Sequence, residues 1–109
     1  MKQIEKNTEK LFCDIMKKVL KETKDGVNFR IIVEEVDDKT YLIIEKYTPK
    51  SDFNYKIEYP RIEYNCDKID LEHLKVLFIM CDLKCDYEEK TLIGWIKSSK
   101  VKKYRKINH

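Results

Sequence analysis

The chain contains no alanine and very little glycine or proline. It has two glycines, Gly26 and Gly94, and two prolines, Pro49 and Pro60. Loops that cradle phosphates, and close approaches of the backbone to a ligand, usually need clustered glycines. The two glycines lie far apart, and no Walker loop, dinucleotide fingerprint, nucleophile-elbow motif or zincin motif occurs. The sequence therefore predicts a protein that is not an enzyme, has no catalytic residues and holds no cofactor.

Long apolar runs are also missing. The longest, Val76–Cys81, has six residues, whereas a helix that spans a membrane needs about 18 or more. The first ten residues, MKQIEKNTEK, are charged throughout and lack the apolar segment of a signal peptide. We therefore expect a soluble cytoplasmic protein without membrane contact. Its cysteines would then be reduced thiols: Cys13, Cys66, Cys81 and Cys85.

Cysteine and histidine leave two chemical alternatives open. One of the later cysteines with His73 could form a nucleophile and its base, although no third group that would orient the pair is visible. Cys81 and Cys85 are also spaced by one helical turn, and Cys66 with His73 could complete a four-ligand zinc site. Structural zinc usually takes two ligands from a tight turn, and no turn residues separate Cys81 from Cys85. We predict buried or surface thiols and no metal.

Charge of one sign is missing from the C-terminal segment. Residues 97–109 hold six of the 23 lysines and arginines and no carboxylate, which leaves residues 1–96 with 17 basic and 20 acidic side chains. The formal charge of +3 thus hides an acidic body and a basic end, and clustered cations attract polyanions. A chain of 109 residues is long enough for one core. We predict a single α+β domain over residues 1–96 and a basic tail over residues 97–109.

Apolar spacing predicts the first four elements. Residues 1–24 repeat apolar side chains at helical intervals and end at Asp25-Gly26, a favourable helix terminus. Residues 27–36, 41–47 and 53–59 read as strands joined by short turns, so they should pair antiparallel. Ile62 and Tyr64 could add a fourth strand to this sheet of three.

Two helices are expected to complete the domain. Asp70 is a plausible N-cap for the first, although residues 76–81 could instead be a buried strand. Asp86 could cap the second, with lysines at its other end. The predicted order is α-β-β-β-α-α, an α+β fold with the N-terminal helix across one face of an antiparallel sheet. The residues expected to be most buried are Phe12, Ile15, Val19, Ile31, Val33, Ile43, Leu74, Leu77, Phe78 and Trp95.

Four carboxylates crowd one end of the first predicted hairpin: Glu34, Glu35, Asp37 and Asp38. Such an acidic tip could dock on a basic protein groove or mimic the phosphates of a nucleic acid, because opposite potentials attract. A charged hairpin end that discourages sheet-to-sheet aggregation is the alternative interpretation. We take these residues as the candidate protein-binding site.

Aromatic side chains alternate along the third predicted strand, at Phe53, Tyr55 and Tyr59. Sheet faces that bind RNA present aromatics for base stacking. Aromatics are equally favoured on any half-buried strand, so a place in the core is the alternative.

The C-terminal segment is the candidate nucleic-acid-binding site. Residues 91–101, TLIGWIKSSKV, followed by KKYRKI, resemble the recognition helix and wing of excisionase-type winged helix-turn-helix proteins, in which a Trp-Ile pair packs the helix and a basic strand follows. Ser99 stands where a glycine usually opens the wing. The resemblance implies DNA contacts through the basic residues, which are Lys97, Lys100, Lys102, Lys103, Arg105 and Lys106.

These features favour a non-enzymatic binding protein. We expect a protein-binding modulator or inhibitor of nucleic-acid-handling machinery, of the anti-defence type that viruses and mobile elements carry, anti-CRISPR proteins included. The lysine- and isoleucine-rich composition, typical of an AT-rich genome, agrees with that class. Direct binding of DNA or RNA through the basic segment is the alternative, and the acidic body is the reason it ranks second.

Overall fold

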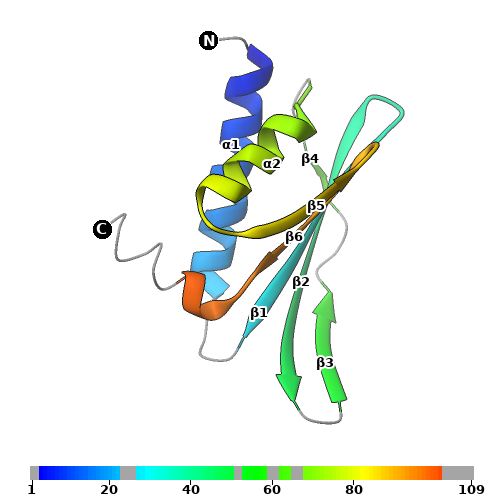
Figure 1. The fold of residues 1–109 in the computed structure, drawn as a ribbon. Coiled ribbons are helices and arrows are strands. Elements are labelled where there is room, and N and C mark those ends of the chain that lie inside the picture. Colours follow the sequence, from blue (N-terminus) through cyan, green and yellow to red (C-terminus); the bar gives the residue numbers. More distant parts are fainter. Residues whose placement is uncertain (1–2, 23–26, 51–52, 59–61, 65–67, 102–109) are drawn as a thin grey trace.

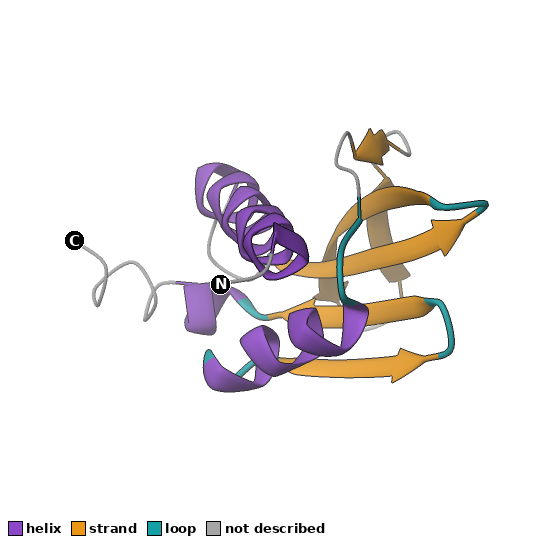
Figure 2. Ribbon diagram, turned by 90° about the horizontal axis from the view of Figure 1, so that it is seen from above, coloured by secondary structure: helices purple, strands orange, loops and turns teal. Residues whose placement is uncertain are grey.

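The structure is a computed structural model that describes residues 3–22, 27–50, 53–58, 62–64 and 68–101. For residues 47–50, 53–58 and 62–64 it describes the backbone alone. Two helices lie on one face of an antiparallel sheet (Figures 1 and 2). The elements are α1 (Gln3–Glu22), β1 (Asn28–Val36), β2 (Lys39–Lys50), β3 (Phe53–Glu58), β4 (Ile62–Tyr64), α2 (Leu71–Met80), β5 (Lys84–Glu88) and β6 (Thr91–Ile96).

The strands follow the order β3-β2-β1-β6-β5, and β4 also pairs with β2. Every pairing is antiparallel. The predicted α+β class, the N-terminal helix across one face and the antiparallel pairing of residues 27–64 are confirmed. The fourth strand at residues 62–64 is confirmed as well, and two further strands come from a segment that was expected to be helical.

Helix α1 buries one apolar stripe against the sheet. Leu11, Ile15 and Val19 recur at a spacing of four residues, and each is fully buried. This spacing keeps side chains on one face of a helix, while lysines and glutamates occupy the other face. The helix is therefore held by packing of its amphipathic face, as predicted.

The register of the first hairpin decides which face of β2 enters the core. Ile31 and Val33 of β1 are fully buried, and they lie opposite Ile44 and Leu42. Directly opposed residues of an antiparallel pair point to the same face, so Leu42 and Ile44 are buried and Ile43 is not. The prediction that Ile43 belongs to the core was wrong by one position, because alternation alone does not say which of two apolar faces turns inward.

An aspartate flanks helix α2 at each end, Asp70 before it and Asp82 after it. The Oδ1 atom of Asp70 accepts hydrogen bonds from the backbone N–H groups of Glu72 (3.0 Å) and His73 (3.2 Å), which is the predicted N-cap. At the other end Asp82 takes the left-handed conformation (φ 57°). Its N–H bonds the Ile79 carbonyl, and the Leu83 N–H bonds the Phe78 carbonyl, both at 2.9 Å. This Schellman closure stops the helix and sends the chain into β5.

The predicted second C-terminal helix, beginning at Asp86, was wrong. Residues 84–96 form the hairpin β5–β6, and only residues 98–101 make a helical turn within the C-terminal part that the structure describes. Leu92, Gly94 and Ile96 are buried while the residues between them are half-exposed. This period of two is the strand signature. It also turns Trp95 to the face away from the helices, so the predicted burial of Trp95 was wrong.

Phe78 of α2 packs against both α1 and the β5–β6 hairpin. Its ring is fully buried, meets Phe12 of α1 edge-to-face at 5.3 Å, and lies over Gly94 of β6. A Cβ atom at position 94 would lie 2.7 Å from the Phe78 ring, so glycine is needed for this close approach. Burial is confirmed for the predicted core residues except Ile43, Leu77 and Trp95, which are partly exposed.

Candidate functional site

Two hairpin tips lie side by side at one end of the sheet (Figure 1). The first is the two-residue turn Asp37-Asp38 between β1 and β2, and the second is Glu89-Lys90 between β5 and β6. The Glu35 N–H donates a 2.9 Å hydrogen bond to the Lys90 carbonyl, which ties the tips together. The turns therefore form one surface.

This surface, which we call the acidic end, is richer in carboxylates than the sequence suggested. Asp37 and Asp38 are exposed, and Glu34 and Glu35 are half-buried beside them. The second hairpin adds three exposed carboxylates that sequence reasoning had assigned to a helix cap and surface. Lys39 and Lys90 are the exposed lysines of the two turns. The acidic end therefore comprises Glu34, Glu35, Asp37, Asp38, Asp86, Glu88 and Glu89.

The turns at this end carry backbone strain. Asp37 (φ 51°) and Asp38 (φ 63°) both lie in the left-handed region, as a type I′ turn requires, and Glu89 (φ 53°) does so in the second turn. Asn-Gly, Asp-Gly and Gly-Gly are the usual pairs in type I′ turns. Asp37 fits this preference, whereas Asp38 stands where glycine is preferred and Glu89 is a longer acidic residue at a left-handed position.

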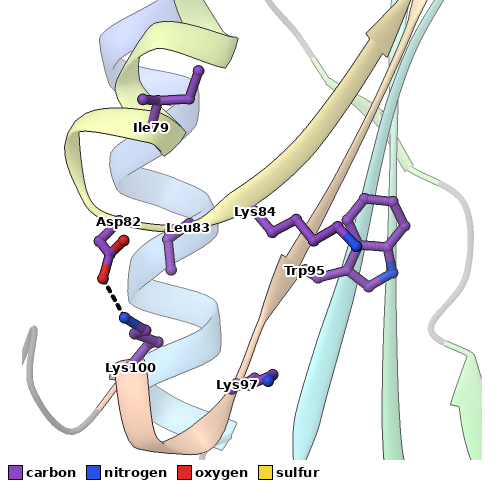
Figure 3. A pocket seen from close by; sticks show the side chains of 7 residues that line it. All are labelled: Ile79, Asp82, Leu83, Lys84, Trp95, Lys97 and Lys100. Carbon is purple, nitrogen blue, oxygen red and sulfur yellow. Dashed lines mark hydrogen bonds and ion pairs between the residues drawn. The ribbon is translucent and has the colours of Figure 1, made fainter.

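The opposite end of the sheet holds a basic hollow of about 360 Å³ (Figure 3). Its apolar lining comes from the end of α2 and from the chain that leads into β5, while Trp95 closes one side. Three lysines surround it, from the start of β5, the end of β6 and the helical turn that follows. The lining residues are Ile79, Asp82, Leu83, Lys84, Trp95, Lys97 and Lys100.

Contacts within the basic hollow orient several of these groups. The Lys84 Nζ atom lies 5.2 Å from the centre of the Trp95 ring, a cation–π distance. Lys100 forms an ion pair with Asp82, and Figure 3 shows these two side chains pointing toward each other. Sequence reasoning missed Lys84 and Trp95 here, because residues 84–96 were assigned to helices. In the structure the start of β5 lies beside the end of β6, where Lys84 pairs with Trp95.

The predicted basic tail begins inside the folded part. The Ser98 N–H donates to Asn28 Oδ1 at 3.2 Å, and Val101 is fully buried. Lys97 and Lys100 therefore belong to the domain and line the basic hollow. The other candidate residues of the tail, Lys102, Lys103, Arg105 and Lys106, lie outside the described residues.

The winged-helix interpretation of this segment is contradicted. Residues 91–96, in the part of the segment that the resemblance implied to be helical, form strand β6, which is paired on both sides with β1 and β5. A strand in the middle of a sheet cannot enter a DNA groove as a helix does. The aromatic stripe of Phe53, Tyr55 and Tyr59 falls on side chains outside the described part of the structure.

Among the described residues, the cysteines and His73 do not cluster as a metal site. His73 lies near Glu9 of α1, with 3.6 Å between Nε2 and Oε1, and eight residues of helix, about 12 Å, separate it from Cys81. Cys66 lies outside the described residues, and within the described ranges no three potential metal ligands cluster.

The two thiols near α2 are held in the protonated form. Burial raises the pKa of Cys81, and the neighbouring Cys13 raises it further. Burial also raises the pKa of Cys85, and Lys75, which lowers it, does not compensate. A nucleophilic cysteine needs the opposite shift.

Comparison with known proteins gives no family model, no curated protein and no solved structure that matches this chain. In the described part of the chain, no helix has both the length and the apolar character needed to cross a membrane.

Proposed function

We propose that this protein is a non-enzymatic modulator that docks its acidic end on a basic surface of a partner protein, one that handles nucleic acid. The observation that carries the proposal is the hydrogen bond between the two hairpin tips. It brings carboxylates from two separate hairpins onto one surface, where the sequence alone indicated four on one turn.

Electrostatic attraction gives such a surface a kinetic role. Complementary charge speeds diffusional encounter by about 10–1,000-fold at low salt, and salt weakens it. A surface that binds nucleic acid is basic and is therefore the natural complement of a cluster of carboxylates. Such a modulator would compete with nucleic acid for that surface, which is how an anti-defence inhibitor would act.

The turn chemistry supports a binding role over a purely structural one. Asp37 and Asp38 are exposed and take part in no ion pair among the described residues, and Asp38 stands where a type I′ turn prefers glycine. Like charges on adjacent strands also repel. The raised pKa of the Cys81 thiol agrees with a protein that performs no cysteine chemistry.

Capture of a partner is the first test. The purified protein is immobilised and exposed to host lysate with and without nuclease. A stoichiometric protein that survives nuclease treatment and is eluted by salt supports the proposal. Recovery of nucleic acid alone would contradict it.

Paired neutralising variants then locate the surface. Asp86→Asn with Glu88→Gln removes two charges from the acidic end, whereas Asp14→Asn with Glu22→Gln removes the same two kinds of charge from α1. We expect the first pair to slow association with the captured partner by about 2–10-fold at low salt. The second pair should change it little. Equal rates for the two variants would show that the acidic end is not the docking surface.

A further inference from the structure

We propose that the basic hollow binds single-stranded nucleic acid, with lysines contacting phosphates and Trp95 contacting a base. This site lies at the far end of the sheet from the acidic end, so the proposal does not depend on the docking function. It also differs from the tail predicted from sequence, because Lys84 and Trp95 belong to β5 and β6.

The charge of the basic hollow is positive although the body as a whole is acidic. Lys84, Lys97 and Lys100 come from three consecutive segments of chain, and Asp82 is the one carboxylate among the described residues that line the hollow with them. Asp82 forms an ion pair with Lys100. The positive charges of Lys84 and Lys97 are therefore not offset by that carboxylate. The surface offered to a ligand at this end is therefore cationic.

The distance between the two ends of the sheet weakens the repulsion that the carboxylates of the two turns exert on a nucleic acid bound at the lysines. β6 starts at the acidic end, where Thr91 lies opposite Glu88, and ends beside the basic hollow. Five residue steps of about 3.4 Å separate its two ends by about 17 Å. The Debye length at physiological ionic strength is about 8 Å. At that spacing the carboxylates of the two turns are largely screened from a strand bound at the lysines, whereas Asp86 lies only two residues, about 7 Å, from Lys84 and opposes binding there.

Trp95 supplies the aromatic surface that single-strand binding uses. It is the chain's single tryptophan and is half-exposed at the side of the basic hollow. Lys84 lies over its ring at 5.2 Å, and its flexible chain lets the ammonium group move to a phosphate when a base approaches. Ile79 and Leu83 add apolar lining to the hollow on the side of α2. Aromatic stacking beside cations is the common mode for single strands.

The sequence continues the positive charge from this same end. Val101 is buried, so the described chain ends next to Lys97 and Lys100. The following residues contribute four more cations in the sequence, at Lys102, Lys103, Arg105 and Lys106. Single-stranded nucleic acid is flexible enough to contact successive cations, and its bases are accessible to Trp95. A duplex hides its bases from such a side chain.

The test measures binding of a labelled oligo-dT strand to the full-length protein by fluorescence anisotropy, together with the emission of Trp95. We expect quenching of Trp95 on binding, and an affinity that falls with salt. Contacts from Lys84 and Lys97 alone give a log–log salt slope of roughly −1.4, since each phosphate contact on a single strand contributes about −0.7.

Variants separate the parts of the site, with folding checked by thermal melting. Lys84→Glu with Lys97→Glu should abolish most binding, whereas Lys6→Glu, an exposed lysine on α1, should leave it nearly unchanged. Trp95→Leu should weaken binding about 5–150-fold, while Trp95→Phe retains most of it. Asp82→Asn should strengthen binding, because it removes the carboxylate that competes for Lys100.

Three outcomes would overturn the proposal. The first is equal binding of duplex and single strand without quenching of Trp95. The second is binding that survives the Lys84→Glu/Lys97→Glu change but is lost when residues 102–109 are removed. The third is displacement of the strand by poly-glutamate at equal charge concentration, which would assign the hollow to acidic protein segments.

Discussion

The hairpins β1–β2 and β5–β6 share one sheet, and each has a two-residue turn, but different contacts hold them. β1 is paired on both sides and buries Ile31 and Val33 completely. β5 is an edge strand whose residues are exposed apart from the half-buried Cys85. The first hairpin is stabilised by apolar pairs within its own strands. The second depends on α2, because Phe78 lies over Gly94.

Because of that difference, we expect the two proposed binding surfaces to tolerate mutation differently. The acidic end is made by residues of the two turns and of the strand ends beside them, none of which belongs to the buried core, so we expect their charges to change without loss of the fold. The basic hollow is made where α2, β5 and β6 meet, so its shape depends on the packing of Phe78 and Leu83. We therefore expect mutations to separate charge from stability at the first surface more easily than at the second.

The largest effect is expected where the second hairpin meets α2. Gly94→Ala places a methyl group 2.7 Å from the Phe78 ring, and overpacking of this kind costs about 1–3 kcal/mol. Denaturant unfolding of the variant measures the loss. Because Phe78 is the neighbour that must move, Phe78→Leu should cost less in the Gly94→Ala background than in the parent. Additive losses would contradict a direct clash.

The next largest effect is expected from substitutions in the turn of the first hairpin. Asp37→Asn with Asp38→Gly installs the favoured type I′ pair and removes two neighbouring charges. We expect a gain of roughly 1–2 kcal/mol in unfolding free energy, while association of the protein with its docking partner slows. Asp37→Gly with Asp38→Asn, which removes the same charges, should stabilise less because Asn-Gly is the preferred order. Unfolding and stopped-flow association on the same samples test both effects. A stabilised variant with unchanged association would separate the turn from the docking surface.

The same contrast explains which parts of the chain the sequence could predict. β1 and α1 carry their own signals, a β-branched run and an apolar stripe of helical period, and both were predicted correctly. Residues 86–96 carry mixed signals. Asp86 and two glutamates before lysines are typical of a capped helix, whereas Leu92, Gly94 and Ile96 alternate as in a strand. Phe78 resolved the conflict through a contact sixteen residues away, which local patterns do not contain.

The two proposed surfaces follow the same rule. The four carboxylates at the end of the β1–β2 hairpin could be grouped from the sequence, because neighbours in sequence stay neighbours in a hairpin. The three from the second hairpin were missed, since their place depends on β6 pairing with β1. The basic hollow combines segments that sequence reasoning had treated as a helix and a tail.

The smallest effect tests whether the second turn is strained like the first. Glu89 takes φ 53° at the first central position of its turn, where glycine avoids the clash of Cβ with the backbone. Glu89→Gly should stabilise the protein by about 0.5–1 kcal/mol, since relief of the left-handed strain exceeds the entropy lost by glycine. Thermal unfolding measures it, at roughly 4–8 °C per kcal/mol for a domain near this size.

Glu89→Gln is the matched control, because it removes the same charge and keeps the side chain. If the gain comes from the backbone, Glu89→Gln leaves the melting temperature close to that of the parent while Glu89→Gly raises it. If the two variants gain equally, repulsion among the carboxylates of the acidic end is the cause. Charge rather than turn geometry would then be the main cost of placing both hairpin tips on one surface, and the two hairpins would be alike in this respect.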